Sequence, residues 1–181
     1  MNQTISKKVE SKIKEDLSPT RNLTGLHLKI VATIAIIWSL FQLWYASPFP
    51  FMFNIGMFKG LPARAIHLGF ALTLAFLIYP FSKGKKISIF DIIISFVAAF
   101  SCLYIYFFYD QLVDRGGVLL NISLSKNFNL PLELIIGISG ILILLEATRR
   151  AIGIPLVIIA IIFLLFSYFG RYAPEIISHG G

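Results

Sequence analysis

The chain has 181 residues, of which 57% are hydrophobic and only 14% are charged, and its mean hydropathy is +0.81. A water-soluble domain of this length rarely has so apolar a composition, so we expect most of the chain to lie in a lipid bilayer. The single cysteine, Cys102, excludes a disulfide or a thiolate metal cluster within one chain.

Residues 1–24 form a polar, lysine-rich tail that precedes the first apolar stretch. The run "SKKVESKIKEDL" has apolar residues at four-residue spacing, which fits either a short amphipathic helix on the membrane surface or a mobile tail. No early apolar run with a cleavage site follows the start, so we expect no signal peptide. Ser18-Pro19 ends any helix before the membrane domain, residues 25–181.

Five apolar stretches follow, each with about the length that a helix needs to cross a hydrocarbon core of roughly 30 Å. Because lipid offers no hydrogen-bond partners to the backbone, the sequence predicts an all-α integral membrane bundle. The fourth stretch is the shortest and has Glu133 near its start, so four spans are an alternative to five. The predicted spans are approximately 30–46, 65–81, 87–108, 132–147 and 152–169.

The lysines and arginines predict how this bundle crosses the membrane. Eleven of them lie before the first span or in the loops after the second and fourth spans, and five lie on the other side. Cytoplasmic loops are enriched in these residues, so we expect the N-terminus inside and the C-terminus outside. We therefore interpret the net charge of +7 as a signal of membrane topology, and we expect membrane lipid as a partner. The position of the cations argues against binding to nucleic acid.

The first outer loop, "SPFPFMFNIGMFKGLP", is rich in aromatic side chains and carries one charge. Such a loop suits the membrane interface or the surface of another membrane protein better than water. We take its phenylalanines as candidate partner contacts, namely Phe49, Phe51 and Phe53.

Two ionisable residues lie near the ends of the second and third spans. His67 is about one turn inside the outer end of its span, where a hydrogen-bonded structural role is commoner than a proton relay. Asp91 lies in the first turn of the third span, where the helix dipole and the lysines of the preceding turn explain a negative charge. We expect Gly116-Gly117 to end this helix and a polar loop to follow.

The stretch "LLEATRRAIGIP" joins the fourth and fifth spans almost without a loop. Glu146 precedes Arg149 by three residues and Arg150 by four, so one helix places all three where they can pair. Gly153 and Pro155 then predict a helix stop and a new start. Within the fourth span, "GISGI" presents Gly137 and Gly140 as a small face for a partner helix.

Several segments resemble one family. They are "RAIHLGFALTLAFLIYP", "YDQLVDRGG", "LEATRRAIG" and "PLVIIAIIFLLFSYFGRYAPEIISHGG", in this order along the chain. They look like the N-terminal region of the fused permeases of tripartite ATP-independent periplasmic (TRAP) transporters, in the branch that works with TAXI-type binding proteins. The resemblance runs from about Gln42 to the end, and the basic tail does not contribute to it.

The resemblance implies a multi-pass protein of the cell inner membrane that takes part in secondary uptake of an organic acid or similar solute. A periplasmic TAXI-type protein would capture the solute, and the large part of the permease would carry the transport path and the cation sites. The chain resembles the small part plus a leading helix. Relatives continue beyond "HGG", so a separate large chain, or a fragment of a longer permease, is expected.

The residues themselves favour a passive role. Transport sites at membrane depth usually need broken helices or buried ionisable groups, and the middles of the spans contain almost none. An enzyme would need convergent nucleophiles, bases or metal ligands, which three scattered histidines and one cysteine do not supply. We therefore expect a non-catalytic scaffold without cofactor or metal. The alternatives are a stand-alone membrane assembly protein unrelated to transport and a truncated, non-functional permease fragment.

Overall fold

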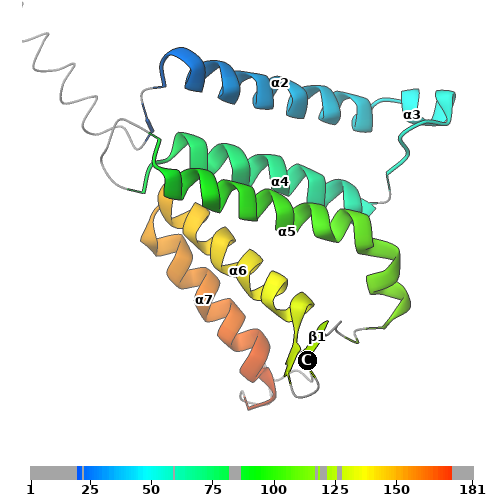
Figure 1. Cartoon of the computed structure of the whole chain (residues 1–181), viewed down its shortest axis with the longest axis vertical. Helices are drawn as coiled ribbons and strands as arrows, with labels where there is room; N and C mark the ends of the chain where they lie inside the picture. The colour runs from blue at the N-terminus through cyan, green and yellow to red at the C-terminus, as the bar shows by residue number, and fades with distance from the viewer. Residues whose placement is uncertain are drawn as a thin grey trace, which may run out of the picture.

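The computed structural model describes residues 20–21, 23–58, 60–81, 87–116, 118, 122–125 and 128–172. This part of the chain is helical apart from one small antiparallel hairpin (Figure 1). The elements are α2 (Gly25–Ala46), α3 (Phe49–Phe53), α4 (Gly60–Ile78), α5 (Ile89–Asp114), β1 (Ile122–Ser125), β2 (Phe128–Leu130), α6 (Leu132–Ala151), α7 (Ile154–Phe169) and the 3-10 turn η1 (Gly170–Tyr172).

Each of the five predicted spans overlaps one of the long helices, and α2, α4 and α5 are long and apolar enough to cross a membrane. The 20 residues of α6 are long enough, but the helix carries two glutamates and two arginines near its ends. The 16 residues of α7 extend only about 24 Å at 1.5 Å per residue. The crossing of α6 and α7 and the inside–outside orientation therefore remain predictions.

Helix α4 is the centre of the bundle. It packs against α2 on one side and against α5 and α6 on the other (Figure 1). The hairpin of α6 and α7 fans away from α4 and α5, and its closed end lies beside the start of α5. Helix α7 packs chiefly against α6 and has no buried residue, so almost its whole apolar surface faces outward.

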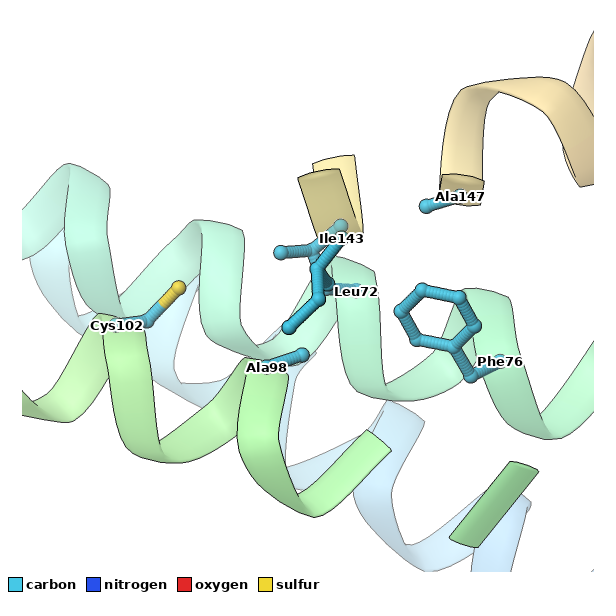
Figure 2. Packing of buried hydrophobic residues seen from close by; sticks show 6 residues of the cluster. All are labelled: Leu72, Phe76, Ala98, Cys102, Ile143 and Ala147. Atoms are coloured by element: carbon cyan, nitrogen blue, oxygen red, sulfur yellow. The ribbon is translucent and has the colours of Figure 1, made fainter. Parts of the chain in front are cut away.

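Two apolar clusters hold these helices together. In the first, apolar residues of α4, α5 and α6 pack together, and the side chain of Phe76 is fully buried (Figure 2). In the second, Val31 of α2 packs on Leu74 and Leu77 of α4. Helices α4 and α5 approach each other closely at Gly69, because a Cβ there would lie 3.2 Å from the Cβ of Cys102 on α5.

The turns between the helices follow from their glycines and prolines. Gly153 has φ 114° between α6 and α7, a conformation that favours glycine, and Pro155 lies in the first turn of α7, as the sequence predicted. The outer aromatic loop contains the short helix α3. The segment expected to be a polar loop after α5 contains the β1–β2 hairpin.

Three predicted features lie outside the described residues. They are the amphipathic helix of the N-terminal tail, the lysine turn at 82–86, and the C-terminal segment 173–181.

Candidate functional site

The site with the most charge lies where α4 ends, α5 begins and α6 ends. A helix leaves its last carbonyl groups without partners inside the helix, and these carry the negative end of its dipole. At the end of α4, the backbone N–H of Arg21 donates to the carbonyl of Ile78 at 2.9 Å. Arg21 Nη1 donates to Leu77 O at 3.4 Å, and Arg150 Nη1 donates to Tyr79 O at 3.3 Å. Two arginines from distant segments therefore cap α4.

Asp91 joins these two arginines. Its carboxylate accepts from Arg21 Nη2 at 2.6 Å and from Arg150 Nη1 at 2.7 Å, and all three side chains are only 1% exposed. The same residue completes a capping box with Ser88 at the start of α5. The helix start fixes Asp91 in place, and the carboxylate then bridges the segment before α2 and the end of α6.

Glu146 extends the network along α6. Its carboxylate accepts from Arg149 Nε at 2.7 Å and Nη2 at 2.8 Å, and from Arg150 Nε at 2.7 Å. The Arg150 side chain is 1% exposed, whereas that of Arg149 is 39% exposed. The two neighbouring arginines thus differ sharply in environment, although both pair with one glutamate.

Aromatic rings close the site on its apolar side. The guanidinium carbon of Arg150 lies 4.9 Å from the ring centre of Phe76 and 5.3 Å from that of Phe81. Arg149 lies 5.8 Å from the Phe81 ring centre. Such cation–π contacts stabilise a guanidinium most where it is desolvated, as at Arg150, whose side chain is 1% exposed.

We call Arg21, Asp91, Glu146, Arg149 and Arg150 the ion cluster. Three cations and two anions give it a formal charge of +1. Arg21 Nε and Arg150 Nη2 are buried without a hydrogen-bond partner. A partly paired buried charge contributes little net stability, but removing one member leaves an uncompensated charge. The cluster is therefore suited to fixing one arrangement of four chain segments.

A smaller polar group lies at the other end of the bundle. Glu133, near the start of α6, accepts from Tyr104 Oη of α5 at 3.1 Å and from Arg115 Nη2 at 2.5 Å. The Glu133 side chain is 3% exposed and that of Arg115 is 26% exposed. We call these three residues the far-end group. It ties α5 to α6 at the end opposite the ion cluster.

His67 is the third polar centre. Its Nδ1 lies 2.8 Å from Gln42 Nε2 and accepts from Trp38 Nε1 at 3.4 Å, so it joins α4 to α2. The structural, hydrogen-bonded role expected for this histidine fits these contacts. In the described part of the chain, no group of three His, Cys, Asp or Glu side chains could hold a metal ion.

The structure brings some of the predicted site residues together and leaves others apart. Glu146, Arg149 and Arg150 pair as their spacing predicted. Three aromatic candidates on α3 are exposed, namely Phe49, Phe51 and Phe53. Gly137 and Gly140 of α6 line an apolar groove between α4, α5 and α6, and a Cβ at either glycine would contact no other residue. Contacts of these residues with another protein remain predictions.

One residue was missed. We expected the lysines before α5 to balance Asp91; these lysines lie outside the described residues, and in the described part of the chain the partners of Asp91 are Arg21 and Arg150. Arg21 was counted only as one of the cations that set the topology, yet its guanidinium is buried. An arginine two residues after Ser18-Pro19 carries no local signal for a partner that lies 70 residues away.

Comparisons with known proteins do not place the chain in a family. No protein-family model matches it, and no curated protein or solved structure is significantly similar to it.

Proposed function

We propose that the chain is a non-catalytic membrane scaffold, the small membrane part of a TRAP-type secondary transporter in the inner membrane. In this role it supports a large transport part and helps to dock a TAXI-type periplasmic binding protein. The observation that carries the proposal is the position of the charges. In the described helices, the charged side chains lie within the first or last two turns, and those of the ion cluster bind helix ends to one another.

This distribution favours bracing over transport. A solute path would be expected to carry polar or ionisable groups at mid-membrane depth or to interrupt a helix there. Here α2, α4 and α5 are continuous, and the apolar cluster where α4, α5 and α6 meet consists of Leu, Phe, Ala, Cys and Ile (Figure 2). The buried hydroxyls of Ser95 and Ser101 on α5 donate to backbone carbonyls. A bundle with an apolar core and with helix ends joined by ion pairs favours a passive, supporting role.

Helix α7 supplies a surface for the large part. Its 16 residues contain no charged side chain, and none of them is buried. The exposed phenylalanines of α3 lie at the opposite end of the bundle from the ion cluster, where the predicted orientation puts the periplasm. We assign the first surface to the large membrane part and the second to the binding protein.

Reconstitution tests this proposal. We expect liposomes that contain the chain alone to take up no organic acid, and liposomes that also contain the large permease part and the binding protein to do so. Glu146→Ala should lower the amount of assembled complex without changing solute preference, because it removes the acidic partner of Arg149 and Arg150. Thr148→Ala is the matched control, since the Thr148 hydroxyl donates only within α6.

Two results would contradict the proposal. The first is solute flux through the chain alone that a substitution in the middle of a helix abolishes. The second is a Glu146→Ala variant that assembles normally but transports a different solute.

A further inference from the structure

The contact between α2 and α4 depends on few side chains. Val31 is the one buried residue of α2, and it packs on α4 in the second apolar cluster. Further along α2, Trp38 and Gln42 make the side-chain hydrogen bonds that join this helix to α4 in the described part of the chain, and both bonds end on His67. One imidazole therefore provides the polar link between α4 and the C-terminal half of α2.

The two hydrogen bonds fix the protonation state of His67. Trp38 Nε1 lies 3.4 Å from His67 Nδ1, and an indole N–H can only donate, so Nδ1 has to be the unprotonated nitrogen of the ring. Gln42 Nε2 lies 2.8 Å from the same Nδ1 and donates to it through an amide N–H. In this arrangement the ring is neutral and carries its proton on Nε2.

A second proton on the ring would make this contact repulsive. An imidazolium carries an N–H at both nitrogens and has no acceptor, so its Nδ1–H would face the N–H groups of Trp38 and Gln42. The Gln42 amide can turn and offer its oxygen, but the indole of Trp38 has no acceptor to offer. The His67 side chain is exposed, so its ring is accessible to protons.

The groups around His67 do not favour a charged ring. Among the described residues, no carboxylate forms an ion pair with His67. Arg64 is a cation three residues before it on α4, and Glu133 of α6 is bound within the far-end group. The titratable or charged residues of α2, α4 and α5 in this half of the bundle are Tyr45, Arg64, Cys102, Tyr106, Tyr109 and Asp110.

We propose that His67 is a proton-sensitive latch: the neutral ring holds the C-terminal half of α2 on α4, and protonation of the ring releases it. A proton shifts the balance between two arrangements only if it binds one of them better. It binds the released arrangement better, because Nδ1 has no donor against it there. The contact is therefore present where the ring is neutral and is lost as the pH falls through the range in which histidines titrate, about pH 8 to 5. The inference does not depend on a transport role.

Pulsed electron paramagnetic resonance on the full chain in lipid nanodiscs tests the latch. Spin labels are attached at Leu43→Cys on α2 and Phe107→Cys on α5, both at exposed positions, in a Cys102→Ala background. We expect one distance between the labels at pH 8 and a second, longer distance at pH 5. The ratio of docked to released α2 should fall about tenfold or more, the size expected for two lost hydrogen bonds. The same single distance at both pH values would overturn the proposal.

Three variants separate His67 from other effects of acid. His67→Asn offers a carbonyl oxygen to Trp38 and Gln42 and does not titrate in this range, so α2 should stay docked at both pH values. His27→Asn makes the same substitution at a histidine in the first turn of α2 and should keep the full response. Trp38→Phe removes the donor that cannot turn, so the response should shrink. A response that persists in His67→Asn, disappears in His27→Asn or is unchanged in Trp38→Phe would overturn the latch.

Discussion

Arg150 Nη1 lies 2.7 Å from Asp91 Oδ1, which joins the last turn of α6 to the first turn of α5 across 59 residues of chain. Arg21 approaches the other oxygen of the same carboxylate at 2.6 Å. Because both arginines depend on one buried anion, the stability of this end of the bundle should depend strongly on Asp91.

Asp91→Asn tests that dependence while keeping the size of the side chain. The substitution removes the charge partner of buried Arg21 and leaves buried Arg150 with Glu146, and we expect the free energy of unfolding to fall by about 3–5 kcal/mol. Thermal scanning of the detergent-solubilised chain measures the change. Asp114→Asn is the control, because it removes an exposed carboxylate from the other end of the same helix. Equal effects of the two variants would show that the carboxylate of Asp91 is not a structural centre.

Arg149 and Arg150 are adjacent on α6 but differ in burial, so the same substitution at each compares an exposed arginine with a buried one. Arg150→Met removes a cation that is 1% exposed and leaves Arg21 as the one partner of Asp91 among the described residues, so a loss of about 3 kcal/mol is expected. Arg149→Met removes a cation that is 39% exposed, and such a pair contributes at most about 1 kcal/mol. The same thermal assay ranks the variants, and a larger loss for Arg149→Met would contradict the described geometry.

The crossing of α4 and α5 should not tolerate a side chain at Gly69. A Cβ there would lie 3.2 Å from the Cβ of Cys102, and the further methyl groups of valine would meet α5. Gly69→Val should therefore cost about 1–3 kcal/mol through overpacking. Gly60→Val, in open space at the start of α4, should change stability by less than about 0.5 kcal/mol. Unfolding midpoints that do not differ between the two would argue against the close approach.

Cysteine labelling tests the orientation. The native thiol at Cys102 is buried and is replaced by alanine in the background variant. Ile55 and Ile152 are exposed, and they lie beyond the two opposite ends of the bundle. We expect a membrane-impermeant maleimide to label Ile55→Cys in cells with an opened outer membrane, and Ile152→Cys only after the inner membrane is permeabilised. The reverse pattern would mean that the N-terminus lies outside.

Much of the fold could be predicted because hydropathy and spacing are local signals. The five long helices follow from apolar stretches of membrane length. The turn between α6 and α7 follows from Gly153 and the proline after it. The pairing of Glu146 with Arg149 and Arg150 follows from helical spacing alone.

The rest of the site depends on tertiary packing, which these local signals do not encode. The Arg21–Asp91 contact spans 70 residues, and nothing in the sequence around either residue marks the other as its partner. Which cation reaches a buried carboxylate depends on how α4, α5 and α6 cross, and apolar stretches without a strong helical face do not specify those crossings. The apolar groove between α4, α5 and α6 was missed for the same reason, because residues of three helices line it.

The order in which the residues of the ion cluster are synthesised determines when the helices can be joined during translation. Arg21 leaves the ribosome first, Asp91 follows, and the second guanidinium arrives only with Arg150, late in translation. Nascent chains fold from the N-terminus, so the lock on α4 and α5 closes only after α6 has been synthesised. A chain that stops before this point keeps its apolar helices but lacks the second arginine that Asp91 binds in the complete bundle.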